Sequence, residues 1–299
     1  MKKRFISVIL SAMMIMTACA PKEETTSTVA SKQSEKNEDI QATEAAEETS
    51  SSTGKTITIG TPYTIDTFLP WDFTSDGDRY VISNVYECLF EYDANTCIPV
   101  LAESYTNPDD CTWDVKIREN AYWHTGNKLF GDEKVQIKAE DVKWVMDWTM
   151  DPANGSKQQT NLSSVVSSVE VLDDFTLRFT TPEPKALFLF TLSRVMIFPK
   201  KAIDEGFDLN AWPVGSGAFK YVSYQTDDQV VLEKNSDYYI TPNVDEVIFK
   251  IIPDKSVSAI ALQNGEIDIT AQVLSTDIDA IAAQEDLELV PNTLGWYRY

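Results

Sequence analysis

The fold is indicated first by the stretch Thr112-Trp113-Asp114-Val115-Lys116-Ile117-Arg118. Its apolar and polar side chains alternate, and a period of two predicts a strand with one buried face. Leu101-Ala102-Glu103-Ser104-Tyr105 precedes this stretch and Trp123-His124-Thr125-Gly126 follows it. Four more distinctive segments come later, namely Ala139–Val142, Pro213–Phe219, Leu232–Tyr239 and Leu262–Asp268. Each segment alone is weak evidence for a particular fold. The informative feature is that all seven segments occur in this order.

In order and approximate spacing, the seven segments resemble the oligopeptide-type (family 5) solute-binding proteins of bacterial ABC importers, over residues 86–299. The resemblance implies an α/β fold of the periplasmic-binding-protein type (cluster C). It implies a discontinuous core lobe at 55–85 and 193–299, with a mixed α/β subdomain inserted at 86–192. Residues 294–299 resemble the family's crossover strand into a second lobe. We therefore expect a truncated or split member that lacks the second lobe.

The N-terminus predicts export. Lys2, Lys3 and Arg4 precede a short apolar stretch, Phe5 to Met16, which is too short for a transmembrane helix and fits a signal peptide. Small residues lead into Cys19, as in a lipobox, although Met16 stands where Leu is usual. We expect residues 1–18 to be a lipoprotein signal peptide and Cys19 to be lipidated. The alternative is an ordinary signal peptide with an incidental cysteine.

Residues 19–54 are predicted to be a disordered tether. They contain no aromatic residue and few branched apolar residues, so they cannot bury enough apolar surface to offset their ordering entropy. The remaining residues, 55–299, are ample for a core. The net charge of the whole chain is −22, which repels phosphate backbones and argues against nucleic-acid binding.

No motif indicates catalysis. His124 is the only histidine, so a relayed nucleophile would depend on it, and its Trp-His-Thr-Gly context favours loop stabilisation. Gly215-Ser216-Gly217 lacks the third glycine and the following helix of a dinucleotide fingerprint, which favours a tight turn. A disulfide between Cys88 and Cys97 is possible across the turn at 93–96. We expect neither an enzyme nor a cofactor or metal.

The elements expected in the folded region alternate between strands and helices. Helices are expected at 79–89, at 139–150 with Val142, Val145, Met146 and Thr149 on its buried face, at 256–264 ending at Gly265, and from a Ser275 or Thr276 cap to 283. Strands are expected at 56–59, 90–92, 98–101, 113–117, 169–172, 175–179, 219–224, 230–233, 247–252 and 267–269.

The resemblance implies a solute-binding protein that captures extracellular peptides and delivers them to ABC permease subunits. The lipid would hold it on the outer face of the cell membrane. Alternatives are another solute, such as a nickel complex or an oligosaccharide, or a surface lipoprotein that acts as a sensor or adhesin. The ligand-contact residues implied by the resemblance are Asp76, Trp296, Tyr297 and Arg298.

Overall fold

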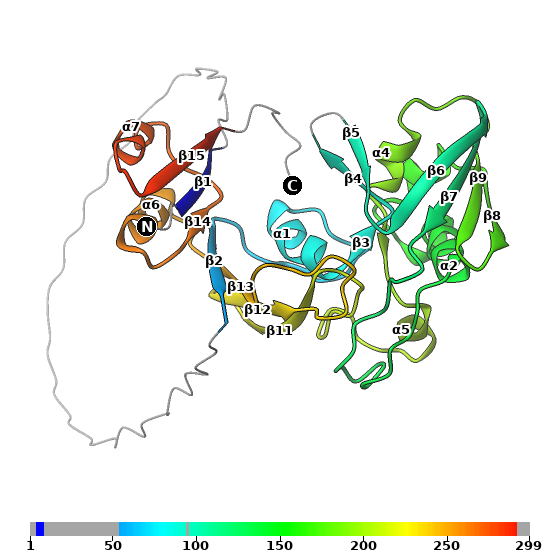
Figure 1. Cartoon of the computed structure of the whole chain (residues 1–299), viewed down its shortest axis with the longest axis horizontal. Coiled ribbons are helices and arrows are strands. Elements are labelled where there is room, and N and C mark those ends of the chain that lie inside the picture. The colour runs from blue at the N-terminus through cyan, green and yellow to red at the C-terminus, as the bar shows by residue number, and fades with distance from the viewer. Residues whose placement is uncertain (1–3, 9–53, 94–95, 292–299) are drawn as a thin grey trace, which may run out of the picture. The chain divides into compact units, whose positions relative to one another are not determined.

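The computed structural model describes residues 4–8, 54–93 and 96–291. Residues 4–8 belong to the same compact unit as the chain from Gly54 onward. Figure 1 shows the order of the elements along the chain. Within the described residues, no helix combines the length and apolar character needed to cross a membrane.

The larger sheet has seven strands in the order β11-β12-β13-β2-β14-β1-β15. Antiparallel pairing joins β11, β12 and β13, whereas β13, β2, β14, β1 and β15 run parallel. Such a mixed, mostly parallel sheet fits the expected α/β class. The strands are β1 (Arg4–Val8), β2 (Thr56–Thr61), β11 (Phe219–Gln225), β12 (Gln229–Lys234), β13 (Glu246–Ile251), β14 (Ile269–Thr270) and β15 (Leu287–Pro291).

Two helices accompany the C-terminal strands of this sheet, α6 (Lys255–Asn264) and α7 (Ile278–Ala282). A Cβ placed on Gly60 of β2 would lie 2.6 Å from Ile267 and 3.0 Å from the Ser258 hydroxyl, so the backbone there lies close to α6. Gly265 ends α6 in the left-handed conformation, with φ of 79°, as predicted. The expected cap at Ser275 or Thr276 is wrong, because Asp277 occupies the N-cap position of α7 and makes no side-chain cap hydrogen bond.

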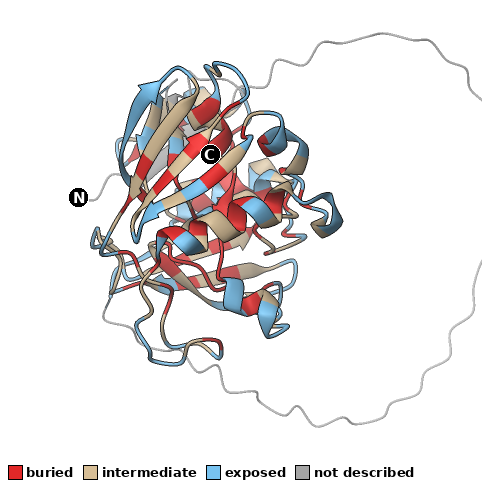
Figure 2. Ribbon diagram, turned by 90° about the vertical axis from the view of Figure 1, so that its right-hand side faces the viewer, coloured by how far each residue is buried: buried red, intermediate tan, exposed pale blue. Residues whose placement is uncertain are grey.

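The smaller sheet has four antiparallel strands in the order β6-β7-β9-β8, all within residues 86–192. They are β6 (Ala102–Asp109), β7 (Thr112–Ile117), β8 (Ser168–Asp173) and β9 (Thr176–Thr180). Helix α2 (Ala139–Met150) has the predicted bounds, and its predicted face is buried (Figure 2). Lys138 makes no side-chain cap, and the Asp141 carboxylate instead accepts from the Lys138 backbone N–H at 2.9 Å.

Short elements complete the fold. These are α1 (Asp76–Val85), β3 (Glu87–Cys88), β4 (Phe90–Asp93), β5 (Thr96–Pro99), η1 (Pro152–Asn154), α3 (Gln159–Ser163), α4 (Phe188–Leu192), β10 (Met196–Ile197) and α5 (Lys200–Asp204). Strand β3 pairs with β10, and β4 pairs with β5. One large apolar cluster extends from α1 through α2 to the strands β12 and β13. A second, smaller cluster joins α6, α7 and β15.

Two further expectations about local structure are wrong, and the structure answers the question of the disulfide, which the sequence left open. The helix expected at 79–89 begins at Asp76 and ends at Val85, because Glu87 and Cys88 form β3. Strand β6 was not expected at all. The disulfide left open by the sequence is absent, since Cys88, Cys97 and Cys111 are free. Its two cysteines face other residues, with Cys97 opposite Tyr92 and Cys88 opposite Met196.

Candidate functional site

Helix α1 is fixed at its start by a reciprocal cap. The Ser75 hydroxyl accepts from the Asp78 N–H at 3.0 Å, and the Asp78 carboxylate accepts from the Ser75 N–H at 3.4 Å. Asp78 is buried and also accepts from the N–H groups of Asp66 and Thr67, at 2.7 and 3.1 Å. One carboxylate therefore holds both the helix and the preceding loop.

The end of α1 is clamped by the Gly215-Ser216-Gly217 segment. The Gly217 N–H donates to the Val85 carbonyl at 2.8 Å. A Cβ on Gly215 would lie 2.1 Å from the Val85 carbonyl oxygen, and one on Gly217 would lie 2.4 Å from that of Asn84. The two glycines are therefore required by close backbone approach, and the segment is a structural turn, as its sequence indicated.

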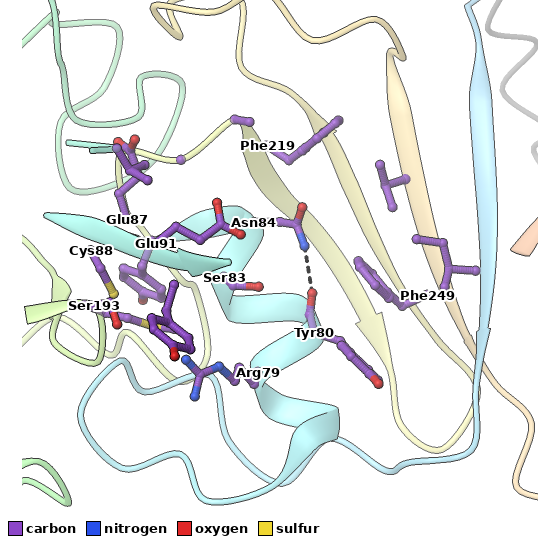
Figure 3. Close-up of a pocket in the computed structure, with 18 of the residues that line it drawn as sticks. Arg79, Tyr80, Ser83, Asn84, Glu87, Cys88, Glu91, Ser193, Phe219 and Phe249 are labelled. Carbon is purple, nitrogen blue, oxygen red and sulfur yellow. Dashed lines mark hydrogen bonds between the residues drawn. The ribbon is translucent and has the colours of Figure 1, made fainter. Parts of the chain in front are cut away.

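A cavity of about 790 Å³ opens beside α1 (Figure 3). Its walls come from α1, β3, β4, the segment from α4 to β10, and the strands β2, β13 and β14. The volume falls within the roughly 300–1,000 Å³ typical of small-ligand sites. The cavity therefore joins elements that lie far apart in the sequence, and it is the candidate functional site.

The two sides of the cavity differ in chemistry. One side is an apolar floor, which the larger sheet supplies through Ile57, Ile59, Val247, Phe249 and Ile269. Ile57 and Ile59 share a face because side chains alternate along a strand. The other side is a polar wall, and Figure 3 shows part of it with Arg79, Cys88 and Ser193 close together. The residues of the polar wall are Arg79, Ser83, Asn84, Glu87, Cys88, Glu91, Ser193 and Arg194.

Both signs of charge occur on the polar wall. Burial raises the pKa of the Cys88 thiol to about 12, with Arg79 and Arg194 acting in the opposite direction and Glu87 and Glu91 adding to the rise. Cys88 is therefore a neutral thiol near neutral pH, unsuited to nucleophilic attack. Two guanidinium groups and two carboxyl groups therefore lie near enough to Cys88 to influence its thiol. Such a wall is suited to a ligand that carries both charges.

Glu87 is the most deeply buried charged group of the cavity lining, with 4% of its surface exposed. Its carboxylate accepts from the Ser216 hydroxyl at 2.7 Å and the Tyr238 hydroxyl at 3.1 Å, and from the Tyr239 hydroxyl. Burial raises the pKa of Glu87 to about 7, while these hydrogen bonds act in the opposite direction. Glu87 thus links β3 to the segments at 213–218 and 235–240.

His124 has a structural role. Its ring is 2% exposed, and its Nδ1 accepts from the Gly215 N–H at 3.4 Å. The proton therefore lies on Nε2, which donates to the Gly217 carbonyl at 2.9 Å. Burial lowers the pKa of His124 to about 4, so the ring is neutral at neutral pH. His124 braces the glycine turn, in agreement with the loop-stabilising role expected from sequence.

Most of the residues that the sequence analysis indicated for ligand contact lie outside the described residues. Cys19, Trp296, Tyr297 and Arg298 lie outside the described residues. Asp76 is exposed in the first turn of α1 and is not among the described residues of the cavity lining. The pKa of Tyr63 is raised by burial and, to a smaller extent, by the Asp76 charge. Ligand contact by all four binding candidates stays a prediction.

The polar wall itself was missed by the sequence analysis. The clearest available signal was Glu87, an acidic residue within the otherwise apolar run from Val85 to Phe90. A carboxyl in such a run must be exposed, paired or functional. Arg194 gave no comparable signal, because its neighbourhood in space depends on the pairing of β3 with β10.

The chain is similar to known proteins of one family. The model of the family "bacterial extracellular solute-binding proteins, family 5 Middle" matches residues 96–299. The chain belongs to this family. The family was expected from the seven ordered segments, and the expectation is confirmed.

Curated relatives are considerably longer than this chain. The glutathione-binding protein GsiB of Escherichia coli (strain K12) is 27% identical over 250 residues, which cover 81% of this chain and 47% of the relative. A putative ABC transporter peptide-binding protein of Brucella ovis is 30% identical over 217 residues, covering 69% and 39%. The chain thus spans about half the length of the curated relatives it matches, or less.

Solved structures of solute-binding proteins are also similar to this chain over about half of their own length. The ABC transporter-associated periplasmic binding protein DppA from Helicobacter pylori, in complex with the peptide STSA, has a TM-score of 0.70 at 26% identity and covers 77% of this chain and 49% of its own. NikZ from Campylobacter jejuni, in complex with Ni(L-His), has a TM-score of 0.66 at 26% identity, with 77% and 45% covered. The expected fold class is confirmed for the part of the family's fold that this chain spans.

Proposed function

We propose that this chain captures extracellular peptides for an ABC importer, acting as a solute-binding component and not as an enzyme. The observation that carries the proposal is the cavity of about 790 Å³ beside α1. Its apolar floor and its wall of mixed charge complement a peptide, which has apolar side chains and two charged termini. Family membership supports transport over a sensor or an adhesin, and the relatives' names include glutathione-binding and peptide-binding proteins.

A different solute for the same transport role is the second candidate. NikZ was solved with Ni(L-His), and AgaA from A.tumefacien R10, with a TM-score of 0.69 at 26% identity, was solved with agropinic acid. The chemistry of the cavity favours peptides, because its floor is broad and apolar. Within the described residues, no group of three or more His, Cys, Asp or Glu side chains could hold a bare metal ion. A metal would therefore arrive already complexed.

The remaining ligand contacts complete the proposal. Trp296, Tyr297 and Arg298 would approach the ligand from the end of the sequence, and Asp76 would do so from the start of α1. The core lobe would comprise 55–85 and 193–299 and the inserted subdomain 86–192. Two observations are compatible with this division, since the four-stranded sheet lies within 86–192 and the strands of the seven-stranded sheet lie outside it.

Ser83→Trp should weaken solute binding by about tenfold or more without unfolding the protein. Ser83 is exposed on α1 and lines the cavity, so an indole there fills space that a ligand needs. Calorimetric titration of the full chain with a mixed tri- to pentapeptide library, with glutathione and with a nickel–histidine complex should show a loss of about tenfold or more for the preferred ligand. Ser223→Trp, on the exposed face of β11 and away from the cavity, is the matched control.

The outcomes of this titration separate the candidates. Binding of peptides by the parent that only Ser83→Trp weakens supports the peptide proposal. Binding of the nickel complex alone would transfer the proposal to the second candidate. Equal peptide affinity in parent and Ser83→Trp would show that the cavity is not the site.

The proposed anchor is Cys19, which would hold the processed protein to the outer face of the cell membrane. Cys19→Ala should lose incorporation of a fatty-acid analogue and should move from the membrane fraction to the medium. A single acyl chain binds membranes only marginally, whereas a bacterial lipoprotein carries at least two and is held stably. Labelling of intact cells, with Cys111→Ala as the cysteine control, measures the effect. Equal labelling of Cys19→Ala and the parent would eliminate the anchor.

A further inference from the structure

Two arginines line the candidate cavity, Arg79 and Arg194. Arg79 lies in the first half of α1, and Arg194 lies in the connection between α4 and β10. Both residues are half-buried. The whole chain contains only six arginines, and no lysine occurs among the described residues of the cavity lining. These two guanidinium groups are therefore the permanent positive charges that the described part of the cavity presents to a ligand.

Both guanidinium groups act on the same region of the polar wall. Burial raises the pKa of the Cys88 thiol, and the charges of Arg79 and Arg194 both oppose this rise. Cys88 lies on β3, opposite Met196 of β10 and close to Arg194 through that pairing. Figure 3 shows the Arg79 side chain directed toward Ser193 and Cys88. The pairing of β3 with β10 thus brings together two cations that are far apart in the sequence.

The two carboxyl groups of the polar wall are placed differently. Both oxygens of Glu87 accept hydrogen bonds, from the Ser216 hydroxyl at 2.7 Å and from the Tyr238 hydroxyl at 3.1 Å. Figure 3 shows the Glu87 carboxylate pointing away from Arg79. Glu91 is exposed on β4, where solvent and salt screen its charge. The half-buried arginines are screened less, so their charges dominate the inner part of the polar wall.

Guanidinium groups are suited to carboxylates, because two parallel N–H donors match the two carboxylate oxygens. A guanidinium has five N–H donors, so each arginine can keep a contact within the protein and still donate two hydrogen bonds to a ligand. Helix α1 adds a hydroxyl beside Arg79, since Ser83 lies one turn later and also lines the cavity. A carboxylate that enters this part of the cavity is therefore met by two cations and a hydroxyl donor.

We propose that Arg79 and Arg194 form a subsite for the C-terminal carboxylate of a bound peptide, and that they make the cavity specific for peptides with a free C-terminus. This inference rests on the proposed function and adds to it the chemical class of the ligand. A terminal carboxylate is present in every peptide acid, whatever its side chains. The apolar floor can then accept varied side chains while the arginines fix one end of the ligand.

The net charge of the chain favours the opposite preference. At −22, the long-range field of the protein attracts cations and repels anions. A peptide with a C-terminal amide has one negative charge fewer than the same peptide with a free carboxylate, so this field favours the amide. Tighter binding of the acid therefore requires a local source of positive charge, and Arg79 and Arg194 supply it.

The first measurement compares acids with amides on the parent protein. The probe is the mixed tri- to pentapeptide library, prepared once with free C-terminal carboxylates and once with C-terminal amides. Calorimetric titration of the full chain should show about tenfold or more tighter binding of the acids. A third set of amides ends in Glu and so carries a carboxylate on the last side chain only. If this set bound as tightly as the acids, the assignment to the C-terminus would be overturned.

Substitutions assign the preference to the two arginines. Arg79→Gln and Arg194→Gln should each weaken binding of the acids by about tenfold and leave binding of the amides unchanged. Arg178→Gln is the matched control, because it removes the same charge from β9, where Arg178 pairs with Asp114 outside the cavity. It should keep the full preference for acids. If a glutamine variant fails to fold, Arg79→Lys and Arg194→Lys keep the charge, lose the paired donors and should lower the preference severalfold.

The possible results separate this inference from the proposed function. Equal binding of acids and amides by the parent would overturn the carboxylate subsite and leave peptide capture standing. A preference for acids that the folded cavity variants retain, or that Arg178→Gln loses equally, would also overturn it. If the parent binds neither form, peptide capture itself is wrong and the subsite is wrong with it. Loss of the preference in the cavity variants alone supports both.

Discussion

Glu87→Gln is expected to gain stability relative to the parent as the pH rises from about 5 to about 8. The folded-state pKa of Glu87 is about 7, above the ordinary value of 4.5, because the carboxyl is buried. A raised carboxyl pKa means that the folded state holds the proton more tightly than the unfolded state. The stability that this proton contributes is fully present below about pH 4.5 and is lost as the pH rises through about 7.

The expected size of this effect is about 3 kcal/mol between the two ends of the range, since one pKa unit corresponds to about 1.4 kcal/mol. Gln cannot titrate but keeps one oxygen acceptor for the hydroxyl groups of Ser216, Tyr238 and Tyr239. Urea unfolding of parent and variant at each pH gives the difference in free energy of unfolding. A difference that does not change with pH would contradict the assigned protonation of Glu87.

A matched control separates burial from charge. Glu103 lies on the exposed part of β6, where its hydrogen bond to Lys116 lowers the pKa of the carboxyl. Glu103→Gln therefore removes a carboxyl whose proton is held less tightly in the folded state. Its pH dependence should have the opposite sign to that of Glu87→Gln and should be small, because exposed ion pairs contribute little.

Local patterns in the sequence predicted some elements well and failed where pairing is distant. Helix α2 has the predicted bounds and buried face because its own apolar period is sufficient to define it. The end of α1 was misplaced because Glu87 and Cys88 pair with Ile197 and Met196, a contact that no local window contains. Strand β6 was missed because seven of its eight residues are exposed, so it has no apolar alternation.

Prediction of the candidate site from the sequence failed for the same reason, because the site depends on contacts between distant residues. The sequence drew attention to Asp76, yet Asp78, two residues on, is the buried carboxylate that holds α1 and the preceding loop. Both are acidic residues in the first turn of α1, which the sequence analysis had placed before the helix, and the fold buries only Asp78. The polar wall of the cavity combines Arg79 of α1 with Arg194 near β10, and that combination depends on the β3–β10 pair.

Gly215→Ala is expected to destabilise the protein by about 3 kcal/mol and to weaken solute binding as well. The added Cβ would lie 2.1 Å from the Val85 carbonyl oxygen and 2.8 Å from the carbonyl carbon, and backbone atoms cannot rotate away as a side chain can. Overpacking of a tight site typically costs about 1–3 kcal/mol. The displaced groups would include the end of α1 and the hydrogen bonds between residue 215 and His124.

Gly54→Ala is the matched control for this change. Its Cβ would meet the Cβ and Oδ2 of Asp245 at 2.9 Å, but Gly54 and Asp245 are both exposed, so the contact lies at the surface and not against the backbone of α1. Its effect should stay within about 0.5 kcal/mol. Because α1 forms part of the cavity, Gly215→Ala should also lower affinity for the ligand under conditions where the variant remains folded. Urea unfolding and titration of both variants measure the two effects, and a Gly215→Ala protein as stable as Gly54→Ala would show that the glycine turn does not clamp α1.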